Sequence, residues 1–116
     1  LQVMGDGIVR LLDILLAINQ AKFGFVLIDE IENGFHYSIQ ESVWKAISHA
    51  AIENDSQVFA TTHSLECVIN AHETFKNNID SPFSVHRIDR IKDKIKVVNF
   101  DRDTLESAID NRFEIR

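Results

Sequence analysis

The stretch Phe25-Val26-Leu27-Ile28-Asp29-Glu30 decides how this chain folds. Four consecutive apolar residues are too few for a helix and predict a short strand that is buried on both faces. Asn33-Gly34, a few residues later, predicts a loop. Buried parallel strands usually present functional groups at their carboxyl ends. Here that end carries Asp29 and Glu30, and Glu32 follows one step further on.

The composition is that of one globular domain or part of one. The chain has 116 residues, of which 45% are hydrophobic, enough to fill one core. Its net charge is −6, from 12 Lys and Arg against 18 Asp and Glu. This balance argues against a broad, non-specific nucleic-acid binder, which needs clustered positive charge. A lone Cys67 excludes an internal disulfide framework and a Cys-rich zinc site, so we expect a cytoplasmic protein.

The apolar stretches are short. The longest, Ile14–Ile18, cannot span a bilayer, and no secretory signal is visible at the start. We therefore expect no membrane segment. Because the chain begins at Leu1 without an initiator Met, we also expect it to be a piece of a longer polypeptide.

The segments around the first strand predict a βαβ unit. Upstream, Met4-Gly5-Asp6-Gly7 predicts a turn that leads into a helix from Ile8 to Gln20, apolar on nearly every side and therefore buried. Downstream, a helix from Tyr37 to about Glu53, with Ser38 as its cap, leads to a strand at Gln57–Thr62. Two strands joined by a helix are expected to be parallel. If they are neighbours, Glu30 and His63 emerge at the same edge of the sheet.

The last third of the chain predicts a third helix, a hairpin and a fourth helix. Ser64 can cap a helix from Leu65 to about Lys76, and Pro82 interrupts the chain. Two strands, at Phe83–Ile91 and Ile95–Phe100, suit a hairpin, and a helix follows to about Asn111. The hairpin is locally basic, which suits either a solvated edge or a contact with phosphate or a partner; its basic residues are Arg87, Arg90, Lys92, Lys94 and Lys96.

The predicted fold class is therefore α/β, a mostly parallel sheet flanked by helices with a C-terminal hairpin and helix. We expect residues 1–82 to form the core of the domain and residues 83–116 to form its hairpin and helix.

These motifs, in this order, resemble the C-terminal half of ATP-binding-cassette (ABC) type ATPases. One branch that they resemble is the bacterial stand-alone AAA ATPases related to overcoming-lysogenization-defect (OLD) proteins. The apolar run that ends in Asp29-Glu30 resembles a Walker B strand, and Thr61-Thr62-His63-Ser64 resembles a switch-histidine motif. Glu32-Asn33-Gly34-Phe35-His36 resembles that branch's D-loop, although the branch usually has Pro where this chain has Ile31. The ending Glu114-Ile115-Arg116 also resembles that branch.

The resemblance implies a role for each motif. Asp29 would hold the Mg²⁺ of Mg-ATP, Glu30 would polarise the attacking water, and His63 would sense the γ-phosphate. Gly5 and Gly7 stand where the family has its signature, which meets the nucleotide bound by a second protomer, although the usual Ser-Gly-Gly is missing here. The residue types suit these roles, because magnesium prefers carboxylate oxygens, water needs a positioned acceptor, and helix N-termini favour phosphate.

One required part is missing from these residues. No Gly-x-x-x-x-Gly-Lys-Ser/Thr loop occurs, and Mg-ATP needs that loop. The resemblance implies that the loop lies upstream and that this chain alone is inactive. It implies hydrolysis of ATP to ADP and phosphate in a nucleotide-sandwiched dimer, which drives an effector that often acts on nucleic acid in repair or phage defence.

Two other readings remain open from the residues. One is a non-catalytic interaction or dimerisation module without a P-loop. The other is a metal-dependent phosphodiesterase built on Asp29, Glu30 and Glu32.

Overall fold

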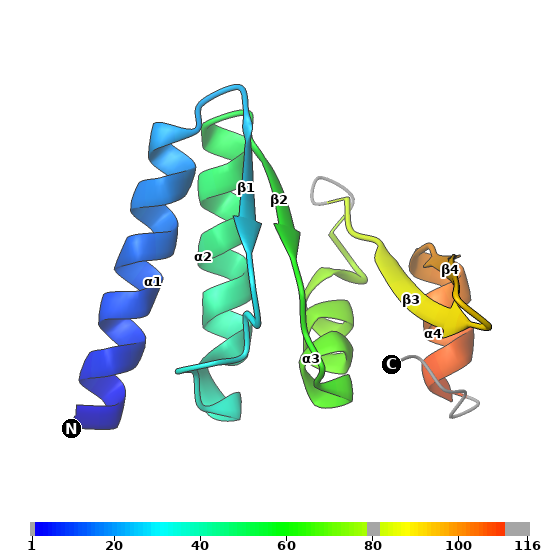
Figure 1. The fold of residues 1–116 in the computed structure, drawn as a ribbon. Coiled ribbons are helices and arrows are strands. Elements are labelled where there is room, and N and C mark those ends of the chain that lie inside the picture. The colour runs from blue at the N-terminus through cyan, green and yellow to red at the C-terminus, as the bar shows by residue number, and fades with distance from the viewer. Residues whose placement is uncertain (1, 79–81, 111–116) are drawn as a thin grey trace.

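The computed structural model describes residues 2–78 and 82–110 (Figure 1). These residues form a parallel pair of strands, a separate antiparallel hairpin and several helices, which confirms the predicted α/β class. In chain order the elements are α1 (Gln2–Gln20), β1 (Phe25–Ile28), the 3₁₀ turn η1 (Tyr37–Ile39), α2 (Gln40–Glu53), β2 (Gln57–Ala60), α3 (Leu65–Phe75), β3 (Val85–Ile91), β4 (Lys94–Phe100) and α4 (Arg102–Asp110).

The predicted βαβ unit is confirmed. β1 and β2 are parallel neighbours, with Phe25 opposite Gln57 and Ile28 opposite Ala60. Backbone pairing continues past both strands, because Thr61 N donates to the Ile28 carbonyl at 2.9 Å. Ile31 N in turn donates to the Thr61 carbonyl at 3.0 Å. The carboxyl ends of the two strands therefore lie at one edge, joined by main-chain hydrogen bonds.

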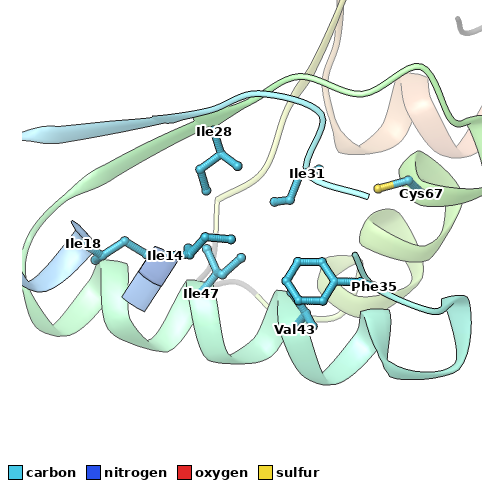
Figure 2. Packing of buried hydrophobic residues seen from close by; sticks show 8 residues of the cluster. All are labelled: Ile14, Ile18, Ile28, Ile31, Phe35, Val43, Ile47 and Cys67. Atoms are coloured by element: carbon cyan, nitrogen blue, oxygen red, sulfur yellow. The ribbon is translucent and has the colours of Figure 1, made fainter. Parts of the chain in front are cut away.

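The main core lies on one side of this small sheet. Figure 2 shows side chains from the end of β1 directed toward side chains of α1 and α2. Burying a side chain of this size fully contributes about 1.5–3 kcal/mol. The cluster therefore holds α1, β1 and α2 together; its members are Ile14, Ile18, Ile28, Ile31, Phe35, Val43, Ile47 and Cys67.

The prediction that β1 is buried on both faces is wrong. Phe25 is 65% exposed and Leu27 is 72% exposed, whereas Ile28 is buried. Side chains alternate between the two faces of a strand, so the helices cover one face of this sheet and the described residues leave the other open. The helix predicted to be wholly buried shows the same asymmetry, because Leu12 and Leu16 are more than half exposed. The hydropathy of a segment indicates which residues favour burial. It does not show whether another layer of the protein covers them.

The predicted turn at Gly5–Gly7 is also wrong. α1 begins at Gln2, so both glycines lie inside the helix. A glycine within a helix costs only about 1 kcal/mol relative to alanine. Burial of Ile14 and Ile18 on the same helix readily outweighs that cost.

The predicted cap at Ser38 is wrong as well. The cap belongs to His36, whose ring nitrogen accepts from Ser38 N at the start of η1. α2 then begins at Gln40 without a side-chain cap. A 3₁₀ turn thus occupies the first residues of the predicted helix.

The C-terminal elements follow the prediction, except that β3 begins two residues later than expected, at Val85, and β4 begins one residue earlier, at Lys94. Ser64 caps α3 by accepting from Cys67 N at 3.1 Å. The hairpin turns at Lys92 and Asp93, both at positive φ, as two-residue hairpin turns require. β4 and α4 pack on α3 through a second cluster; it contains Phe100, Leu105 and Ala108, with Leu65 and Val68 against it. The ending at 114–116 lies outside the described residues. No helix in the described ranges is long and apolar enough to cross a membrane.

Candidate functional site

The two acids at the end of β1 are held by the end of β2. Residues 29–34, which we call the acid turn, follow β1 directly. The Thr61 hydroxyl donates to Asp29 Oδ1 at 2.5 Å, and its oxygen, Thr61 Oγ1, accepts from Glu30 N at 2.9 Å. One side chain just past the end of β2 therefore contacts both acids, and it fixes the Asp29 carboxylate relative to the Glu30 backbone.

Glu30 has an unusual backbone conformation that the acid turn stabilises. Its φ is +48°, which is uncommon for a residue other than glycine. Asn33 N donates to the Glu30 carbonyl at 3.0 Å, and Asn33 Nδ2 donates to Glu30 Oε2 at 2.7 Å. Gly34, at φ +84°, completes the turn in a conformation that favours glycine. Asn33 thus orients the carboxylate of Glu30.

α1 holds the acid turn from the other side. Arg10 Nη2 donates to the carbonyl oxygens of Asp29, at 3.2 Å, and Glu30, at 3.1 Å. The Arg10 guanidinium also lies 5.9 Å from the centre of the Phe35 ring. The acid turn is therefore fixed by residues from α1 and from the end of β2.

The two glycines of the signature-like segment differ in their surroundings. Gly5 is exposed, and a Cβ added there would meet nothing within 4 Å. Gly7 is buried, and a Cβ there would lie 3.0 Å from the carbonyl oxygen of Gly34. Gly7 thus allows α1 to approach the acid turn closely, while Gly5 remains open.

His63 and Glu32 join the two strand ends a second time. His63 N donates to Glu32 Oε1 at 3.3 Å, and the His63 side chain is exposed. Burial alone would raise the pKa of Glu32. Hydrogen bonds from the Thr62 hydroxyl and from the backbone, together with the nearby His63 imidazole, outweigh burial and lower the pKa. Glu32 therefore accepts a hydrogen bond from the backbone of the segment that carries His63.

The three acids do not converge on a common point. Glu30 is directed to Asn33 and Glu32 to His63, while the Asp29 side chain is exposed. Within the described ranges, no group of three His, Cys, Asp or Glu side chains could hold a metal ion. Magnesium that accompanies a nucleotide needs only one or two carboxylates besides water and phosphate oxygens, so Asp29 suits it. This geometry disfavours the reading as a phosphodiesterase built on three carboxylates.

A family model described as "AAA domain, putative AbiEii toxin, Type IV TA system" matches residues 1–69. The chain belongs to this AAA-domain family. The matched residues include α1, the acid turn and His63, so the whole candidate site lies inside the AAA domain. AAA domains in general bind nucleotide, which agrees with acids at the end of a parallel strand.

One curated relative also matches. The chain is 38% identical over 65 residues to "Uncharacterized protein MJECL11" of Methanocaldococcus jannaschii. The match covers 56% of this chain, and the chain spans 57% of the relative. No solved structure matches the chain.

Sequence reasoning located Asp29, Glu30 and His63 at one edge but assigned no role to their supports. Thr61 follows β2 at the position that lies beside the end of β1. The predicted parallel pairing of the two strands could therefore have pointed to Thr61. Asn33 stands three residues after Glu30, a spacing typical of a turn. Arg10 offered no local signal, because it acts across 19 and 20 residues.

Proposed function

We propose that this chain supplies the metal-binding, catalytic and phosphate-sensing residues of an ABC/OLD-like ATPase that hydrolyses ATP to ADP and phosphate. The observation that carries the proposal is the shared edge of β1 and β2. There, Thr61 contacts both acids, and His63 N binds Glu32 of the acid turn. Membership of an AAA-domain family supports nucleotide as the substrate.

Each residue has a role that its surroundings suit. Asp29 would hold Mg²⁺, which neutralises phosphate charge when bound. Glu30 would accept a proton from the attacking water, with its carboxylate oriented by Asn33. His63, exposed just beyond β2, would contact the γ-phosphate.

The active assembly needs parts that these 116 residues do not contain. A P-loop must cradle the phosphates, so we use "intact ATPase" for the polypeptide or assembly that combines this chain with a P-loop. In a nucleotide-sandwiched dimer, the Gly5–Gly7 segment of α1 would complete the site of the second protomer. Nucleotide-driven dimerisation would then control an effector in the cytoplasm. The family description mentions a putative toxin, which supports an effector in phage defence.

The direct test is magnesium-dependent nucleotide binding by the intact ATPase. Asp29→Ala should abolish the part of ATP affinity that depends on magnesium. Glu41→Ala is a suitable control, because Glu41 also carries a carboxylate and forms an exposed ion pair with Lys45 on α2. ATP affinity that responds to magnesium equally in wild type, Asp29→Ala and Glu41→Ala would contradict the proposal.

The open face of the sheet favours a second candidate function, a non-catalytic dimerisation module. Phe25, Leu27 and Phe59 are each more than half exposed on the parallel pair, and parallel sheets are usually covered on both faces. A module of this kind would dimerise without nucleotide, and Leu27→Lys would abolish the dimer. Sedimentation of wild type and Leu27→Lys, with and without Mg-ATP, separates this function from the ATPase.

A further inference from the structure

α1 touches the acid turn at two residues that lie on one face of the helix, three positions apart. Gly7 packs against the Gly34 carbonyl, since a Cβ on Gly7 would come within 3.0 Å of that oxygen. A Cβ on Gly34 would come within 3.2 Å of Arg10 Cδ. Residues at this spacing are neighbours on a helix surface. The helix and the acid turn are therefore in close contact over a full helical turn.

Arg10 binds the backbone at the two residues that carry the proposed chemistry. Its Nη2 donates to the successive carbonyl oxygens of Asp29 and Glu30. Those carbonyls define the orientation of the peptide units at Glu30, the residue with positive φ. The Arg10 Nε is buried and has no hydrogen-bond partner among the described residues, which costs free energy. The hydrogen bonds of the guanidinium are those that Nη2 donates to the backbone of the acid turn.

We propose that Gly7 and Arg10 make α1 a positioning element for Glu30, an inference that rests on the proposed catalytic role of Glu30. Arg10 fixes the two peptide units that flank Glu30, the one before it and the one after it. Gly7 sets how closely α1 approaches the turn. Neither residue touches the reacting atoms. Asn33 then orients the Glu30 carboxylate within the turn that α1 has fixed.

This arrangement couples the start of α1 to the acid turn. Gly5 is open at that end of the helix, and Gly7 and Arg10 follow it along the same rigid element. A contact made by a second protomer near Gly5 would be transmitted to Glu30 through packed atoms and hydrogen bonds. Assembly of two protomers and orientation of the catalytic carboxylate would thus be linked within each subunit.

The first experiment measures how firmly α1 holds the acid turn, and it needs no catalysed reaction. Amide hydrogen exchange of residues 29–35 in the 116-residue chain should accelerate by about tenfold or more in Gly7→Ala and Arg10→Gln, because the turn opens locally more often. Gly5→Ala is the matched control: it adds the same methyl group to the same helix in open space, and exchange at 29–35 should match wild type. Wild-type exchange in both Gly7→Ala and Arg10→Gln would overturn the proposal.

The second experiment uses Arg10→Lys in the intact ATPase, because this change keeps the charge and most of the apolar stem, so the variant should fold. It removes the planar fork that reaches two carbonyls. Misplacing a catalytic group slightly costs up to about 100-fold in rate, so kcat should fall by roughly 10–100-fold. The KM for Mg-ATP should stay within about twofold, since Thr61 still holds the Asp29 carboxylate.

The outcomes separate the inference from the function on which it rests. A raised KM with unchanged kcat, or no change in either, would overturn the positioning role of Arg10. If Glu30→Gln leaves hydrolysis unchanged, the catalytic role of Glu30 fails. The exchange result at residues 29–35 would still report whether α1 holds the acid turn.

Discussion

Thr61, just past β2, donates its hydroxyl to the Asp29 carboxylate, just past β1, across 2.5 Å. The hydroxyl oxygen of Thr61 also accepts the backbone N–H of Glu30. A single hydroxyl thus connects the proposed metal-binding residue, the proposed catalytic residue and the neighbouring strand. Any change to it should affect both nucleotide binding and turnover.

Thr61→Val tests that connection, because valine keeps the shape and removes the hydroxyl. In the intact ATPase we expect kcat to fall and the KM for Mg-ATP to rise, each by roughly tenfold, since a lost hydrogen bond to a charged group is worth about 1.5–3 kcal/mol. Kinetic constants of the purified variant provide the measurement. Thr104→Val is the matched control, because the Thr104 hydroxyl also donates to a carboxylate, that of Asp101 just before α4. Equal effects of the two substitutions would contradict a special role for Thr61.

Glu32 predicts a pH dependence of folding stability. Its pKa in the folded chain lies below the ordinary value of 4.5. The unfolded chain therefore takes up the proton first as pH falls. The stabilisation from Glu32 is complete above pH 4.5 and is lost as pH falls through the lower folded pKa. Urea unfolding of wild type and Glu32→Gln should show a stability difference that shrinks below pH 4.5. A difference that stays constant with pH would contradict this role.

Cys67 provides a chemical probe of the main core. It is 2% exposed, and burial raises the pKa of its thiol, with the Glu32 charge adding to the effect. Because the thiolate is the reactive form, iodoacetamide should label the folded chain far more slowly than the chain in urea. Equal labelling rates in the two conditions would show that Cys67 is not buried in the main core as described.

The 116-residue chain should not bind nucleotide by itself. It lacks the P-loop, whose backbone N–H groups and lysine provide most of the phosphate contacts. Calorimetric titration with Mg-ATP should therefore detect no binding at micromolar concentration. A micromolar dissociation constant for the chain alone would show that the phosphates are held by other residues.

Much of the parallel unit could be predicted because its signals are local. The apolar run before Asp29 and the strand before His63 are each visible within a few residues, and a connecting helix implies parallel pairing. The start of α1 was predicted wrongly because local rules treat Gly5 and Gly7 as breakers. In the structure, Gly7 lies inside the helix, at a position where the Gly34 carbonyl leaves little room for a side chain.

The supports of the site were less accessible to sequence reasoning. The bond from Asn33 to the Glu30 carboxylate depends on the positive φ of Glu30, which residue identity does not predict. The bonds from Arg10 depend on how α1 packs against the acid turn, a long-range property. The open face beside Leu27 likewise depends on which layers surround the sheet, and hydropathy cannot report that.

The central claim is that Glu30 is the catalytic carboxylate, and steady-state hydrolysis by Glu30→Gln in the intact ATPase tests it most directly. Glutamine keeps the size and hydrogen bonding of the side chain but removes its basicity. General-base assistance is worth about 10²–10⁴ in rate, or roughly 3–5 kcal/mol of barrier. The account predicts a loss of turnover in that range, with ATP still bound because Asp29 is intact, and a dimer that accumulates. Hydrolysis by Glu30→Gln within about threefold of wild type, far from that range, would contradict it.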